Sequence, residues 1–189
     1  VGFYSTRTNR VLLYDVTHGQ AADEHWQQNA STIIHEATHQ MAFNTQLHNR
    51  AAMPPRWVGE GLAMLFEAPG VWNAPEHPLA RDRINEGRLS AFRQFASGPR
   101  AGGSLPLFVQ NSERLFATSP AAAYCEAWAL TFFLSETEPA KYLRYLARTA
   151  AREPLRTYSA QEQLQEFTDV FGTDLKMLEA RFLRFIDQL

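Results

Sequence analysis

STIIHEATHQMAF, residues 31–43, sets His35, Glu36 and His39 into a run that otherwise has the apolar pattern of a packed helix. On a helix of about 3.6 residues per turn, His35 and His39 project from neighbouring points of one face, where two ring nitrogens can reach one metal ion. Glu36 lies about a hundred degrees round the helix from His35, so it can act on a metal-bound water without ligating the metal itself. The alternative is a pair of hydrogen-bonded core histidines, and the H-E-x-x-H pattern favours the metal.

The third metal ligand must come from elsewhere, because catalytic zinc takes three protein ligands and keeps a fourth position open. A metzincin would continue the motif with Gly and then His, but those two positions hold Ala42 and Thr45. His48 lies near the expected end of the helix, so the chain would have to fold back for it to reach the ion. Glu60 lies 21 residues after His39, on a second predicted helix that a Pro-Pro turn can bring back antiparallel to the first. Glu60 is therefore a candidate third ligand.

Composition narrows the functional classes. The chain has 189 residues, with 45% hydrophobic and 20% charged residues and a net charge of −2, which is typical of a globular protein. Its basic residues are scattered, so no nucleic-acid partner is expected, and no apolar run reaches the length of a membrane span. The chain begins at Val1, which leads us to expect that an upstream segment has been removed and that the protein works outside the cytoplasm. The lone Cys125 sits among apolar helical residues and is expected to be a packed, inert thiol.

Periodicity predicts an α+β fold, with a small N-terminal antiparallel sheet and a mainly helical body. Strands are expected in GFYS and RVLLYDV on either side of a turn at TRTN. We expect one domain over residues 1–189, with the strands and metal-binding helices in 1–68 and an irregular cover segment followed by C-terminal helices in 69–189. Within the cover segment, 69–120 holds six prolines and one predicted helix, at about 78–95. The later helices are predicted at 121–136, 139–150, from Ser159 with a capping box to Glu162, and from Thr173.

HEATH followed by PRWVGEGLAMLFE resembles the gluzincin metallopeptidases, above all the peptidase MA-like group, which includes bacterial branches known only as domains of unknown function. The later YCEAWALTFFL is similar to a Tyr-x-x-x-Trp helix of that group. The resemblance covers about residues 31–67 and 124–134. It implies a zincin-like fold, zinc held by His35, His39 and Glu60, and Glu36 as the catalytic carboxylate. It does not carry over a substrate.

Other polar residues have two interpretations each. The Tyr124 hydroxyl can donate a hydrogen bond to an oxygen that becomes anionic, or its ring can simply pack on Trp128. Glu67 can support a ligand, but a solvated helix end is the preferred interpretation. The arginines of the predicted cover helix are expected to form a solvated face; they are Arg81, Arg83 and Arg88.

The resulting hypothesis is a zinc-dependent hydrolase, a metallopeptidase whose partner is a peptide or protein substrate. In it, Glu36 serves as general base and the strand near RVLLYD can pair with an extended substrate backbone. One alternative is a module that keeps zinc for binding or scaffolding without turnover. Another is a helical interaction domain in which the motif is accidental. Oligomeric state stays open.

Overall fold

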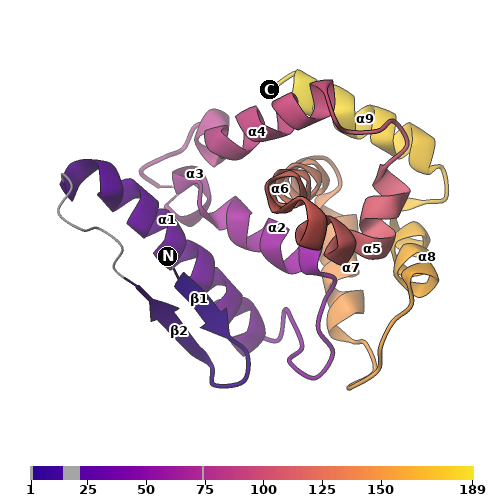
Figure 1. Ribbon diagram of the computed structural model, residues 1–189, viewed down its shortest axis with the longest axis horizontal. Helices are drawn as coiled ribbons and strands as arrows, with labels where there is room; N and C mark the ends of the chain where they lie inside the picture. The colour runs from indigo at the N-terminus through magenta and orange to yellow at the C-terminus, as the bar shows by residue number, and fades with distance from the viewer. Residues whose placement is uncertain (1, 15–21, 74) are drawn as a thin grey trace.

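The computed structural model describes residues 2–14, 22–73 and 75–189, and within these it leaves the side chains of 22–28 and 80 undescribed. The predicted α+β class is confirmed, since a two-stranded antiparallel sheet accompanies a mainly helical chain (Figure 1). None of the described helices combines the length and the apolar character needed to cross a membrane.

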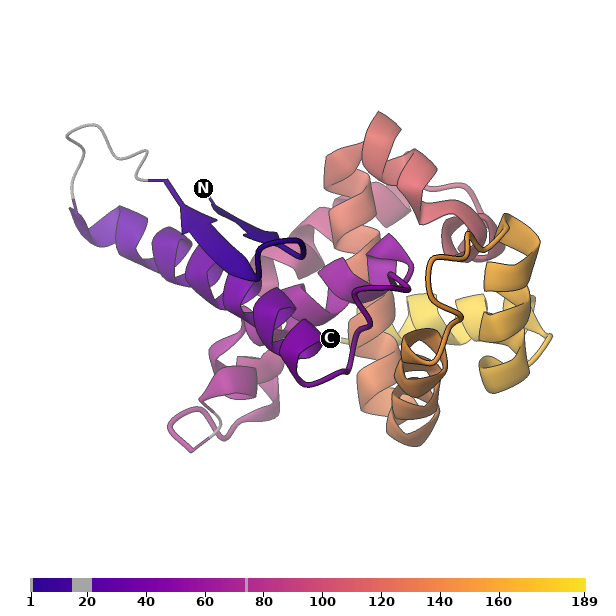
Figure 2. The ribbon, with the colours of Figure 1, turned by 90° about the horizontal axis from the view of Figure 1, so that it is seen from below.

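The N-terminal hairpin consists of β1 (Gly2–Ser5) and β2 (Arg10–Leu13), with Gly2 paired to Leu13 and Ser5 to Arg10. The predicted turn between the strands is confirmed, and it closes through Asn9, whose φ of 55° lies in a left-handed region that asparagine tolerates. The predicted second strand extended to Val16, but residues 15 and 16 lie outside the described part. The hairpin packs along α1 (Ala22–Asn44), as Figure 2 shows.

Helix α6 (Pro120–Thr137) forms the centre of the helical body (Figure 1). It is buried on all sides from Ala123 to Leu134 apart from the partly buried Tyr124, and it packs against helices of both the N-terminal and the C-terminal halves. Its aromatic stripe of Trp128, Phe132 and Phe133 is core, as predicted, and Cys125 is a buried thiol. The surrounding helices are α2 (Arg56–Phe66), α4 (Glu86–Ser97), α5 (Leu105–Thr118), α7 (Pro139–Ala150), α8 (Ala160–Phe171) and α9 (Leu175–Asp187).

The prediction for segment 69–120 is wrong in two respects. Instead of one helix at 78–95, the chain forms α3 (Pro69–Trp72), a 3-10 turn η1 (Ala80–Arg83) and then α4, and it also forms α5, which the prediction lacks. The physical reason is the position of the prolines: three of the six lie in the first turn of α3, α5 or α6, where a missing N–H costs no intrahelical hydrogen bond. Proline there begins helices and does not break them. The predicted Ser159–Glu162 capping box at α8 is confirmed.

Helix α2 approaches α6 so closely that only glycine fits between them. A Cβ atom on Gly61 would lie 2.1 Å from Oγ1 of Thr131 and 2.7 Å from the backbone oxygen of Ala127, both on α6. A Cβ atom on Gly59, in the same helix, would meet only the His39 ring, at 4.0 Å. Gly61 therefore sets the distance between the two helices.

A buried ion cluster joins α4, α6 and α9 through Arg100, which follows α4. Its guanidinium contacts Glu126 of α6 at 2.8 Å and Glu179 of α9 at 2.7 Å, and all three side chains are almost wholly buried. Burial raises the pKa of Glu126, and the Arg100 guanidinium opposes that rise. Two carboxylates inside the core thus share one arginine as their counter-ion.

Arg100→Ala is expected to lower the free energy of unfolding by about 3–5 kcal/mol, because it leaves two buried carboxylates without a partner. The matched control is Arg181→Ala, which breaks an exposed pair with Glu138 and should change stability by less than about 1 kcal/mol. Urea unfolding of both variants measures the difference, and equal losses would contradict the structural role of the cluster.

Gly61→Ala is expected to destabilise the protein by about 1–3 kcal/mol, since its methyl group overpacks the contact with α6. Gly59→Ala should instead stabilise it by up to about 1 kcal/mol, because alanine is the better helix former and the space is open. Thermal and urea unfolding test the opposite signs, and destabilisation of equal size in both would show that the close approach is not the cause.

Candidate metal centre

The structure brings the three predicted ligands together where α1 meets α2. His35 and His39 lie on α1, and Glu60 lies on α2. Nε2 of His35 is 3.2 Å from Nε2 of His39 and 3.3 Å from Oε2 of Glu60, and His39 is 3.6 Å from the same oxygen. One ligand atom from each residue lies within 4.8 Å of the other two, so these three residues can hold a metal ion.

Charge at this centre favours a cation. Burial lowers the pKa of His35, but the carboxylates of Glu60 and Glu67 outweigh burial and raise it to about 9. Burial raises the pKa of Glu60, and its contacts with the two histidines reverse this and bring it well below the usual range. The negative charge of these carboxylates favours a proton on His35, and it equally favours a divalent ion in place of that proton.

Glu67 belongs to the centre, contrary to the predicted solvated helix end. Its Oε1 lies 2.8 Å from Nδ1 of His35, its side chain is only 10% exposed, and its Oε2 accepts a 2.7 Å hydrogen bond from Nδ2 of Asn85. The carboxylate accepts the proton of Nδ1, which leaves the lone pair of Nε2 free for a metal. The prediction failed because Asn85, which covers Glu67, comes from the irregular cover segment, whose path no local pattern specifies. The available signal was the seven-residue spacing from Glu60, two helical turns along one face.

A cavity of about 340 Å³ opens beside these ligands. Glu36 lines it and is only 8% exposed, and within the described part of the chain its carboxylate has no hydrogen bond or ion pair. A carboxylate that is nearly buried yet unpaired can accept a proton from a molecule in the cavity. The lining residues are Gly2, Ser31, Thr32, His35, Glu36, Glu67, Arg88 and Tyr124.

Tyr124 also lines the cavity, and its aromatic partner is Phe116, with ring centroids 5.1 Å apart. The predicted alternative partner, Trp128, stacks on Phe132 instead. Burial and the Glu60 carboxylate raise the pKa of Tyr124, against the opposing effect of the Arg56 guanidinium. The Tyr124 hydroxyl is therefore protonated near neutral pH and can donate a hydrogen bond.

The remaining sequence candidates are His48 and the three arginines of the predicted cover helix. His48 is buried, its Nδ1 bonds the Leu47 carbonyl at 3.0 Å, and burial lowers its pKa to about 4, so it packs as a neutral side chain. The arginine prediction holds only in part. Arg81 is exposed and Arg83 pairs with Glu136, but Arg88 lines the cavity because the start of α4 lies against Glu67.

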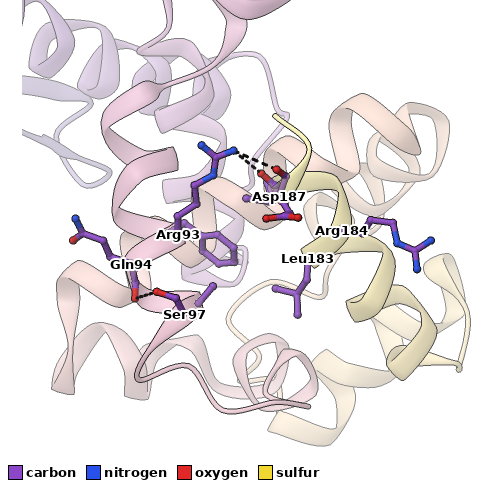
Figure 3. A pocket seen from close by; sticks show the side chains of 9 residues that line it. Arg93, Gln94, Ser97, Leu183, Arg184 and Asp187 are labelled. Atoms are coloured by element: carbon purple, nitrogen blue, oxygen red, sulfur yellow. Dashed lines mark hydrogen bonds between the residues drawn. The ribbon is translucent and has the colours of Figure 1, made fainter.

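A larger hollow of about 790 Å³ lies between α4 and α9 (Figure 3), and none of the three metal ligands lines it. Arg93 reaches across it and donates to the backbone oxygens of Ile186 and Asp187, at 3.3 and 3.5 Å. These carbonyls belong to the last turn of α9, so the Arg93 side chain caps the C-terminal end of that helix. Its role is to hold the two helices together.

Glu67→Ala is expected to weaken Zn²⁺ affinity by about 10- to 100-fold, because Nδ1 of His35 loses the acceptor that orients the ring. Glu67→Gln, which keeps an oxygen acceptor but no charge, should lose less. Competition against a chromophoric chelator measures both. Glu153→Ala is the charge-matched control, since the Glu153 carboxylate is exposed and, among the described residues, contacts only Arg156, at 3.9 Å. Unchanged affinity in Glu67→Ala would contradict the supporting role.

Comparison with the curated proteins and with the solved structures finds no match. A family model described as Protein of unknown function (DUF1570) matches residues 29–156. That range contains His35, Glu36, His39, Glu60, Glu67, Arg88 and Tyr124, and it spans well over half of the chain. The chain therefore belongs to the DUF1570 family.

Proposed function

We propose that the protein is a zinc-dependent metallopeptidase that hydrolyses peptide bonds in the cavity beside His35. The observation that carries the proposal is the joint placement of three metal-ligating atoms and one unpaired carboxylate. His35, His39 and Glu60 form the ligand group, and Glu36 lines the same cavity as His35.

The spacing of the ligand atoms supports zinc. Four-coordinate zinc binds nitrogen and oxygen at about 2.0–2.1 Å, so tetrahedral ligands lie about 3.3 Å from one another. The three separations here are 3.2, 3.3 and 3.6 Å. Two imidazoles and one carboxylate are also a donor set that zinc hydrolases use, with one position left for water or substrate. Bound there, zinc supplies a Lewis acid that polarises a carbonyl and lowers the pKa of water.

Glu36 is the proposed general base. Its carboxylate accepts the proton of the attacking water and then passes it to the departing amide nitrogen, so one group serves both halves of the reaction. The side chain of Glu36 faces the cavity, and its lack of a partner among the described residues leaves both oxygens available. A carboxylate already engaged in an ion pair would be a weaker base.

Tyr124 is the proposed donor to the carbonyl oxygen of the scissile bond. That oxygen becomes negative as the carbonyl carbon turns tetrahedral, and a hydrogen bond to it is stronger in the transition state than in the ground state. The hydroxyl comes from α6, which is fixed in the core, so its position requires little reorganisation during the reaction.

A peptide substrate is supported by the hairpin. Gly2 of β1 lines the cavity, so the strand next to the candidate site is β1 and not the Arg10–Leu13 strand that the sequence suggested. A strand edge offers backbone N–H and C=O groups at the spacing of an extended peptide.

Glu36→Gln is expected to retain about one zinc per chain and to lower peptide turnover by about 10²- to 10⁴-fold, because an amide cannot accept the proton. Zinc is measured by atomic absorption, and turnover is measured by mass spectrometry of a peptide library. Glu153→Gln serves as control, since it makes the same chemical change at an exposed position and should leave turnover unchanged.

The two measurements separate the alternatives. Native protein with stoichiometric zinc but no cleavage would indicate a zinc-containing binding module. Native protein without zinc affinity would indicate an accidental motif. Full turnover in Glu36→Gln would overturn the role of Glu36 alone.

A further inference from the structure

Arg88 is the one arginine among the described residues that line the cavity. It lies in the first turn of α4, and its place there is fixed by Asn85, whose Oδ1 accepts a 3.2 Å hydrogen bond from the Arg88 backbone N–H. Asn85 also donates to Glu67, which in turn contacts His35. The start of α4 is thus tied to the metal centre, and Arg88 is held at its edge.

Among the described residues, no carboxylate forms a hydrogen bond with the guanidinium of Arg88. The carboxylate that it faces is Glu67, and Nη2 of Arg88 is 3.6 Å from Oε1 of Glu67, which is too long for a hydrogen bond. Both oxygens of Glu67 already accept shorter bonds, at 2.8 Å to His35 and 2.7 Å to Asn85. The side chain of Arg88 is 34% exposed, so its N–H donors can be reached by a molecule in the cavity.

The guanidinium of Arg88 also lies against the ring of Tyr124. Its carbon lies 5.5 Å from the centroid of the Tyr124 ring, on which it stacks. Arg56, the other arginine near Tyr124, stacks on Phe116 at 4.4 Å and faces Glu60 and Glu113, and it does not line the cavity. A group that binds Arg88 therefore lies beside Tyr124, in the cavity that Glu36 also lines.

We propose that Arg88 binds a carboxylate of the substrate, so that the site selects peptides that carry a carboxylate next to the scissile bond. The planar guanidinium matches a carboxylate in a two-point contact. This inference rests on the proposed peptidase function and names its substrate class. The carboxylate has two chemical sources, an Asp or Glu side chain or the free C-terminus of a peptide.

The test measures binding to the zinc-loaded Glu36→Gln protein by calorimetry at low ionic strength. Three acetylated pentapeptides are compared: an amide with Asp at its centre, an amide with Asn at its centre, and the Asn peptide with a free C-terminal carboxylate. All other positions are alanine, so each peptide can bind in any register along the site. At least one carboxylate peptide is expected to bind about tenfold more tightly than the neutral amide. The carboxylate peptide that binds more tightly shows whether the recognised carboxylate belongs to a side chain or to the C-terminus.

Arg88→Ala, added to Glu36→Gln, is expected to abolish this preference while the neutral amide binds as before. Arg88→Gln, which keeps much of the stem over Tyr124, is a second variant with the same expected loss. Arg81→Ala removes an equal charge from an exposed position of the same segment and should keep the preference. Zinc content and circular dichroism confirm that each variant is folded and loaded.

Equal affinity of all three peptides, or a preference that persists without Arg88, would overturn the inference. The outcome is separable from that of the proposed function, because the experiment measures binding and not cleavage. Absence of cleavage by the native protein would remove the peptidase proposal and leave the carboxylate measurement valid.

Discussion

The carboxylate of Glu60 lies 3.3 Å from Nε2 of His35, and the rest of the metal centre depends on this contact between two helices. The two histidines need only the geometry of α1 to reach one ion. Glu60 needs α2 to lie at a fixed distance from α1, and α2 is fixed from its other side by α6. The residue after Glu60 is Gly61, which allows the backbone of α2 to approach Ala127 and Thr131 of α6. Packing in the core thus determines where a candidate metal ligand lies.

Helix α4 completes the site from the opposite direction. Its N-cap residue Asn85 uses both ends of its amide, with the oxygen capping the helix and the nitrogen bonding Glu67. Through Glu67 this helix orients His35, and through Arg88 it supplies a cation to the cavity. A single helix terminus therefore connects ligand orientation with the proposed recognition of substrate.

Among the described residues, the buried carboxylates of the core and those of the candidate metal centre are balanced in different ways. In the core, Arg100 pairs with both Glu126 and Glu179 through direct contacts at 2.8 and 2.7 Å. At the metal centre, Glu60 and Glu67 face imidazoles, and Glu36 has no partner among the described residues. A permanent guanidinium makes the first cluster structural. The second cluster can hold a metal ion and includes a carboxylate that can take up and release a proton, as the proposed hydrolysis requires.

The sequence by itself determined what depends on spacing along one helix. His35, Glu36 and His39 are placed by the 3.6-residue period, and Glu60 follows from its distance along the chain and the Pro-Pro turn. The hairpin and the late helices were also predictable, because their periodicity and turn residues are local. Helix α5 was not, because a proline in its first turn resembles a helix break although it begins the helix. Only the tertiary structure decided the roles of Glu67 and Arg88. Both are polar residues on helices that could equally face water, and which face is covered depends on how α2 and α4 pack, a contact between segments that no local pattern encodes.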